Sequence, residues 1–297
     1  MASPVRLRPR VTRVGDERVP GQGTGGRERL TAVRGRVVRS LAFGDRFDAT
    51  EPLDATEPLD ATEPHDSTGP LVVVLPGLGL TFYTRRTAAA LAARGLPCTV
   101  LDLPGFGSSR PRHTRPDIHA IGLTAARWVE SRAADRPVVV LGHSTGAQAA
   151  LTAALALGAR RRRLSLVLAG PTFCPQQRRL TGLASATSLA YRDDRPSEID
   201  PAEAWRGRAG MVAILGSGLR DAPEERIGHL RAPVTVTSGV HDAYAPFDWL
   251  DRLATAARNA PSVRTARLGG SHNNLYTHAA EVADLVALAA HDAAQAG

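Results

Sequence analysis

A serine, an aspartate and a histidine each follow a separate predicted strand, in the chain order Ser144, Asp242 and His272. Ser144 is the central residue of GHSTG (residues 142–146), which fits the pattern G-x-S-x-G. A serine hydroxyl is a weak nucleophile unless a base removes its proton, and a histidine base needs a carboxylate that orients its ring. These residue types in this order predict acyl transfer through a serine nucleophile.

The stretch around Ser144 has the sequence of a sharp turn between a strand and a helix. The apolar run 138–141 ends at Gly142, and an alanine-rich helical pattern starts directly after Ser144. Small residues on both sides allow a tight turn that exposes the serine hydroxyl. The helix that begins at Thr145 directs free backbone N–H groups toward the same space. Taken alone, the stretch also fits a strand–helix turn without chemistry, so the assignment depends on the other residues.

Asp242 and His272 both follow predicted strands closely. The carboxyl ends of parallel strands meet at one edge of an open α/β sheet, where ligand sites are built. We therefore expect both side chains to lie near Ser144. Two alternatives stay open, namely Asp242 as a turn or helix-capping residue and His272 as a surface-loop histidine. His143 is expected to pack in the interior rather than to act in catalysis.

The elements that would hold these residues alternate between strand and helix. The predicted strands, of which the first two turn at Gly35, are 30–33, 36–43, 71–75, 98–101, 138–141, 164–168, 234–237 and 263–268. The predicted helices are 84–94, 118–131, 146–157, 177–189, 201–215, 247–259 and 274–291. This alternation predicts an α/β fold with a doubly wound, mostly parallel sheet.

Three segments depart from the alternation. Residues 1–28 are rich in arginine, glycine and proline and predict a disordered basic tail. Residues 46–69 contain three tandem proline-bearing hexapeptides, which predict a solvated low-complexity insert, with an acidic partner-binding segment as the alternative. Only helical patterns occur over 172–229, which predicts a small helical lid on a core formed by 29–171 and 230–297.

The composition narrows the range of partners. The formal net charge of +8 comes entirely from arginine, since the chain contains no lysine. Aromatic residues make up only 4%, whereas a nucleic-acid surface combines clustered basic residues with aromatics, so no nucleic-acid partner is expected. The chain shows neither an apolar span of membrane length nor a secretion signal, so we expect a soluble cytoplasmic protein. Cys98 and Cys174 indicate neither a disulfide framework nor a zinc site, and no cofactor or metal is expected.

Four motifs together resemble those of the α/β-hydrolase fold-1 family. They are DLPGFGSS (102–109), GHSTG (142–146), GVHD (239–242) and GSH (270–272). The resemblance covers about residues 30–293 and implies the α/β-hydrolase fold with its serine hydrolase, esterase- and lipase-like chemistry. It also implies roles for three residues, with Ser144 as the nucleophile, His272 as the general acid/base and Asp242 as the orienting acid.

The resemblance further implies an oxyanion hole formed by the backbone N–H groups of Leu78 and Thr145. The family's usual His-Gly is replaced by Pro76-Gly77 here, a departure that backbone donors can tolerate. Some members carry the acid after the strand that precedes the lid, but residues 169–172 contain no carboxylate, which favours Asp242.

The expected activity is hydrolysis of a small or medium carboxylic ester. A serine in the turn argues against the family's dehalogenase and epoxide hydrolase branches, which use an aspartate there. Thioesterases, acyltransferases and cofactor-free perhydrolases share the triad, and the family also includes ligand-binding proteins without turnover, so these alternatives stay open. The expected partner is a small-molecule ester or thioester.

Substrate choice is expected to depend on the lid. Its apolar side chains either line the acyl site or pack on one another, and these are Phe173, Leu180, Leu183, Leu189, Tyr191, Trp205, Met211, Val212 and Leu215. Its arginines either bind an acidic substrate or are solvated, and these are Arg178, Arg179, Arg192 and Arg195.

Overall fold

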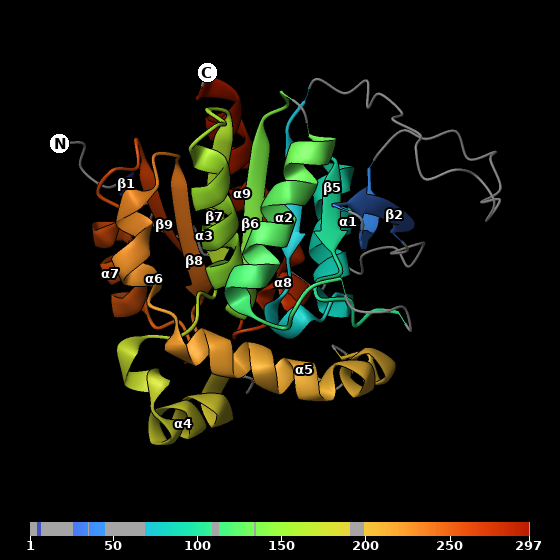
Figure 1. The fold of residues 1–297 in the computed structure, drawn as a ribbon. Coiled ribbons are helices and arrows are strands. Elements are labelled where there is room, and N and C mark those ends of the chain that lie inside the picture. Colours follow the sequence, from blue (N-terminus) through green and yellow to red (C-terminus); the bar gives the residue numbers. More distant parts are fainter. Residues whose placement is uncertain are drawn as a thin grey trace.

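The computed structural model describes residues 5–6, 26–34, 36–44, 69–108, 113–133, 135–190 and 199–296. Nearly all of the predicted insert, most of the predicted tail, Gly35 and the lid residues Tyr191, Arg192 and Arg195 lie outside these ranges. Within them, one sheet of nine strands forms the centre of the molecule (Figure 1). The strands are β1 (Val5–Arg6), β2 (Arg27–Val33), β3 (Arg36–Phe43), β4 (Leu71–Leu75), β5 (Cys98–Leu101), β6 (Val138–His143), β7 (Leu164–Ala169), β8 (Val234–Gly239) and β9 (Val263–Leu268).

The strands follow the order β1-β9-β8-β7-β6-β4-β5-β3-β2 across the sheet. Strands β4 to β9 pair in parallel, β1 joins β9 in parallel, and β3 is antiparallel to both β2 and β5. The chain runs from β4 to β5 on one side and then returns to β6 on the other. Such a reversal opens a crevice at the carboxyl ends of the strands, where ligands bind. The predicted doubly wound, mostly parallel α/β fold is confirmed.

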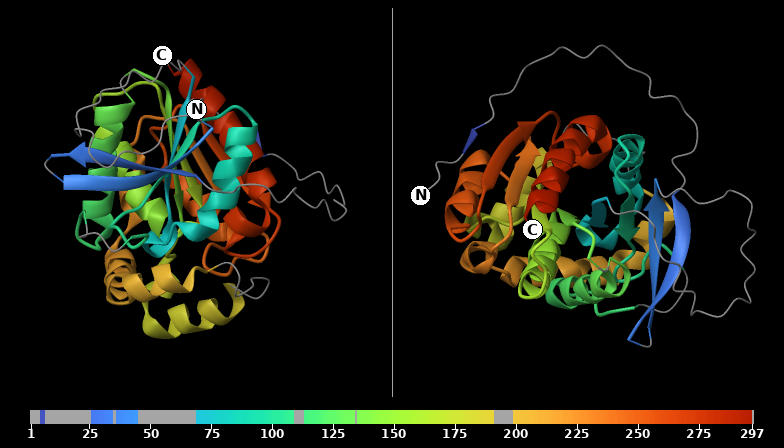
Figure 2. Two further views of the ribbon diagram at one scale, coloured as in Figure 1. Left: turned by 90° about the vertical axis from the view of Figure 1, so that its right-hand side faces the viewer. Right: turned by 90° about the horizontal axis from the view of Figure 1, so that it is seen from above.

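Helices cover both faces of the sheet. The left view of Figure 2 shows the sheet between these two layers of helices. The α-helices are α1 (Arg85–Ala93), α2 (Ile118–Arg132), α3 (Thr145–Gly158), α4 (Leu180–Ala190), α5 (Pro201–Arg220), α6 (Pro223–Arg226), α7 (Phe247–Ala256), α8 (Asn274–Thr277) and α9 (Ala279–Gln295). Side chains alternate along the central strands: Val73 and Val140 join the core with α2, α3 and α7, while Val72 and Val139 join the core with α1 and α9. Burial on both faces explains why these strands are apolar throughout.

Helices α4 and α5 lie between β7 and β8 in the chain and cross the carboxyl edge of the sheet, at the bottom of Figure 1. Helix α5 continues to Arg220, five residues beyond the predicted end, because its last turns are held against the core. The carbonyl of Gly218 accepts from Gln148 Nε2 at 2.9 Å, and a Cβ on Gly218 would lie 3.4 Å from the ring of Phe173. In the described ranges, no helix is long and apolar enough to cross a membrane.

Two helices replace the single predicted helix 274–291. The chain leaves helical geometry at His278 (φ −126°, ψ 42°), between α8 and α9. The ring of His278 packs against the backbone of Gly269 and Gly270, which fixes this residue outside the helix. The carbonyl of His278 then accepts from Val282 N at 3.1 Å, and α9 begins.

Candidate active site

Ser144 lies in a strained turn between β6 and α3. Its backbone angles, φ 57° and ψ −128°, fall in a region that residues with a side chain rarely adopt. The close packing of this turn requires glycine on both sides. A Cβ on Gly142 would meet the carbonyl of Gly146, and a Cβ on Gly146 would meet the carbonyl of Leu75. The sequence GHSTG thus forms the sharp strand–turn–helix that its residue types predict.

The structure brings Ser144, His272 and Asp242 together in one hydrogen-bonded series. His272 Nε2 lies 2.9 Å from Ser144 Oγ, and His272 Nδ1 lies 3.0 Å from each carboxylate oxygen of Asp242. All three side chains are buried, with His272 only 1% exposed. The three residues follow β6, β8 and β9, so the parallel sheet places them at one edge although 128 residues separate the first and the last.

The carboxylate of Asp242 is held in place by backbone donors as well as by His272. Its Oδ1 accepts from Tyr244 N at 2.9 Å and from Ala245 N at 3.1 Å. Gly170, the residue directly after β7, packs directly against this pair. A Cβ there would lie 3.0 Å from Asp242 Oδ2 and 3.2 Å from His272 Nδ1, so a side chain at this position would crowd the pair.

The two residues predicted to form the oxyanion hole also lie side by side. Leu78 occupies a left-handed conformation (φ 52°) in the short 3-10 helix after β4. Its N–H donates to Thr145 Oγ1 at 2.8 Å. Thr145 is the first residue of α3, where backbone N–H groups have no partner within the helix. The N–H of the predicted donor Leu78 therefore bonds to a side chain in this structure, and it can bind another acceptor only after that hydroxyl moves away.

His143 and Tyr83 join the site although sequence reasoning assigned neither of them a role. His143 is buried as predicted, and its ring lies 4.9 Å from that of His272. Burial and the neighbouring His272 lower the pKa of His143 to about 3, so its ring is neutral at physiological pH. The hydroxyl of Tyr83 lies 2.8 Å from His143 Nδ1, and burial raises the pKa of Tyr83 above its usual value. The order of the chain gives no signal for this pairing.

The first half of α5 is fixed to the loops around the site. Glu203 is 2% exposed, and its carboxylate accepts from the backbone N–H groups of Thr81 and Phe82 at 2.8 and 3.1 Å. Burial raises the pKa of Glu203, although these donors act in the opposite direction. Arg206 Nε donates to the carbonyl of Phe106 at 2.7 Å. Helix α5 is thereby joined to the loops that follow β4 and β5.

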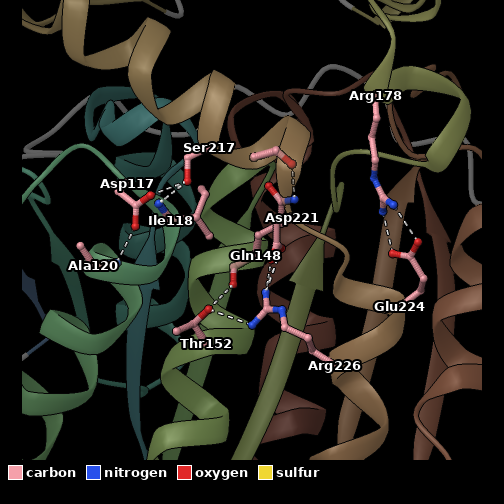
Figure 3. Close-up of polar contacts among 11 residues, drawn as sticks. Asp117, Ile118, Ala120, Gln148, Thr152, Arg178, Ser217, Asp221, Glu224 and Arg226 are labelled. Atoms are coloured by element: carbon pink, nitrogen blue, oxygen red, sulfur yellow. Dashed lines mark hydrogen bonds and ion pairs between the residues drawn. The ribbon is translucent and has the colours of Figure 1, made fainter.

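Polar contacts also fix the second half of α5 and the segments beside it, as Figure 3 shows. Ser217 Oγ lies 2.8 Å from Asp117, the residue that caps α2. Asp221 pairs with Arg226, which also reaches Thr152 on α3. Further contacts join Gln148 to the carbonyl of Gly218 and Arg178 to Glu224. Polar contacts therefore hold α5 over the carboxyl edge of the sheet at both of its ends, in addition to its apolar contacts.

The lid side chains with open roles separate into two groups. Leu189, Trp205 and Val212 are 54%, 69% and 69% exposed, so they face solvent and do not line a buried acyl site. Phe173 is 2% exposed and packs edge-on against Tyr244, whose ring in turn meets His272 at 4.8 Å. Phe173 is therefore separated from the triad by one side chain, that of Tyr244.

Comparison with known proteins identifies the family. The family model described as "Alpha/beta hydrolase family" matches residues 72–285. The chain belongs to this family. The match covers the described core from β4 to α9 and includes Ser144, Asp242 and His272. No three His, Cys, Asp or Glu side chains of the described ranges cluster as metal ligands.

Individual relatives of this α/β hydrolase are distant. The spectinabilin polyketide synthase system protein NorC of Streptomyces orinoci is 32% identical over 188 residues, which are 60% of this chain but 8% of NorC. A lipase-esterase related protein from Clostridium acetobutylicum ATCC 824 matches with a TM-score of 0.64 at 13% identity, over 85% of this chain and 99% of its own. The thioesterase domain from the curacin biosynthetic pathway matches with a TM-score of 0.56 at 18% identity, over 89% and 99%.

Proposed function

We propose that this α/β hydrolase cleaves a small or medium carboxylic ester through an acyl-enzyme on Ser144. The observation that carries the proposal is the continuous series from Ser144 Oγ through both nitrogens of His272 to Asp242. It combines a nucleophile, a base and an orienting carboxylate within hydrogen-bond distance, which are the groups that acyl transfer requires. The strained backbone of Ser144 supports the same role.

In the first half-reaction, Ser144 Oγ attacks the carbonyl carbon while His272 Nε2 takes its proton. Asp242 keeps the proton of His272 on Nδ1 and stabilises the imidazolium that forms. The negative oxygen is stabilised by the backbone N–H groups of Leu78 and Thr145 after it replaces the Thr145 hydroxyl. The imidazolium then protonates the leaving oxygen or sulfur, and the acyl group stays on Ser144.

In the second half-reaction, His272 removes a proton from water, whose oxygen attacks the acyl carbon. The same two N–H groups stabilise the second oxyanion. The imidazolium returns its proton to Ser144 Oγ as the acyl bond breaks, so the carboxylic acid leaves and the free enzyme is restored.

A thioester is the second candidate substrate, and two of the relatives point to it. NorC belongs to a polyketide synthase system and the curacin protein is a thioesterase domain. The triad serves both reactions, since they differ only in whether oxygen or sulfur leaves.

The test is a matched panel of p-nitrophenyl esters and acyl thioesters of the same chain lengths, from acetyl to octanoyl. We expect saturable hydrolysis with the highest kcat/KM at one range of chain lengths, and only a residual rate with Ser144→Ala. Higher kcat/KM for the thioester at every chain length would identify a thioesterase. Saturable binding without release of any product would contradict the hydrolase proposal and indicate a ligand-binding member of the family.

A further inference from the structure

We propose that Tyr83 and His143 are positioning residues that join the oxyanion loop to the catalytic histidine through one chain of hydrogen bonds. The proposal rests on the hydrolase function proposed above. It assigns the two residues no contact with substrate. Their role is to hold Leu78 and His272 at one fixed separation while charge develops on both sides of Ser144.

The chain of hydrogen bonds begins in the oxyanion loop. The N–H of Gly77, which directly precedes Leu78, donates to Tyr83 Oη at 2.6 Å. Tyr83 Oη lies 2.8 Å from His143 Nδ1, and His143 Nε2 lies 2.8 Å from the carbonyl oxygen of His272. Three side-chain hydrogen bonds thus connect the segment after β4, the last residue of β6 and the segment after β9.

The chemistry of the groups fixes every proton in this chain. A carbonyl oxygen only accepts, so His143 Nε2 carries the proton that is donated to His272 O. A neutral imidazole has one ring proton, so Nδ1 is the acceptor and Tyr83 is its donor. Tyr83 Oη then uses a lone pair to accept from Gly77 N. All donors point one way, and no partner can be removed without leaving a buried group unpaired.

The backbone of His272 is held from both sides. Its N–H donates to the carbonyl of Ala190 at 3.0 Å, at the end of α4, and its carbonyl accepts from His143. Its ring already bonds to Ser144 and Asp242. His143 is the residue directly before Ser144. Its hydrogen bond to the His272 carbonyl therefore fixes the position of the His272 main chain relative to the Ser144 turn.

The neutral state of His143 has a second consequence for the reaction. The rings of His143 and His272 lie 4.9 Å apart, so a charge on His143 would oppose the imidazolium that forms on His272. Burial lowers the pKa of His143 to about 3, which keeps the ring uncharged while His272 takes up its proton. The neutral ring of His143 can therefore hold the His272 backbone without destabilising the imidazolium of the transition state.

Tyr83→Phe tests the proposal because it removes only the hydroxyl. We expect kcat for a p-nitrophenyl ester to fall about 10- to 100-fold with little change in KM, since small misplacements of reacting groups cost rates of this size. Active-site titration with a fluorophosphonate gives kcat per folded site, which separates this loss from any loss of folded protein. The matched control is Tyr276→Phe, which removes the hydroxyl of the tyrosine that packs on Arg86. Its kcat is expected to be unchanged.

Two variants of His143 give an independent measurement. The Gln side chain of His143→Gln offers an N–H donor near the original Nε2, whereas His143→Leu offers none. We expect kcat of His143→Gln to be about tenfold higher than that of His143→Leu. Adding Tyr83→Phe to His143→Leu is expected to lower kcat little further, because both residues belong to one series of hydrogen bonds.

Equal kcat per titrated site in wild type and Tyr83→Phe would overturn the proposal, and so would equal kcat in His143→Gln and His143→Leu. Either result would make the two residues part of the fold alone. These outcomes are distinct from failure of the proposed function, in which the wild type itself turns over none of the esters or thioesters.

Discussion

Ser144→Ala is expected to lower kcat by about 10⁵- to 10⁶-fold, which is the loss seen when a triad serine is removed. The variant keeps the Cβ and with it the strained turn, so the backbone of β6 and α3 has no new freedom. His272 keeps its bonds to Asp242, but no nucleophile remains 2.9 Å from Nε2. The residual rate reflects binding and the oxyanion donors alone.

Steady-state hydrolysis of the best ester or thioester of the panel measures this loss. Ser131→Ala is the matched control, because Ser131 bonds only locally to the carbonyl of Trp128 at the end of α2. Its kcat is expected to equal that of the wild type. Turnover by Ser144→Ala within about tenfold of the wild type would exclude an acyl-enzyme on this residue.

Asp242→Asn is expected to lower kcat by about 10⁴-fold, as loss of the orienting acid does in other triads. The asparagine oxygen can still accept from Tyr244 N and Ala245 N, so the side chain keeps its place. Its NH₂ group then faces His272 Nδ1 and donates to it. The ring proton moves to Nε2, which points at Ser144 Oγ and can no longer take its proton.

Asp248→Asn is the matched control, because it makes the same aspartate-to-asparagine change in the first turn of α7. We expect it to keep the wild-type kcat. The reverse pattern, with activity kept in Asp242→Asn and lost in Asp248→Asn, would assign the acid to Asp248.

The fold and the three candidate catalytic positions could be predicted because local sequence carries their signals. Apolar runs of β-branched residues predict the central strands, and the ends of parallel strands meet at one edge of the sheet. Ser144, Asp242 and His272 follow β6, β8 and β9, so chain order alone predicts their proximity. The break between α8 and α9 could not be predicted, because it depends on the packing of His278 against glycines in another loop.

The contacts that fix the site could not be predicted, because they join side chains far apart in the sequence. Tyr83 lies 60 residues from His143, and Glu203 lies 122 residues from Thr81. Neither pair has a periodic pattern or a motif that singles it out. The same limit applies to Leu78, since only the folded chain brings the Thr145 hydroxyl to its N–H.

The proposed acyl-enzyme requires a nucleophilic Ser144, which mass spectrometry of the protein after reaction with a fluorophosphonate can detect. We expect one phosphonyl adduct per chain, located by peptide fragmentation on Ser144 and absent from Ser144→Ala. A wild-type protein that stays unmodified, or an adduct on any other residue, would contradict it.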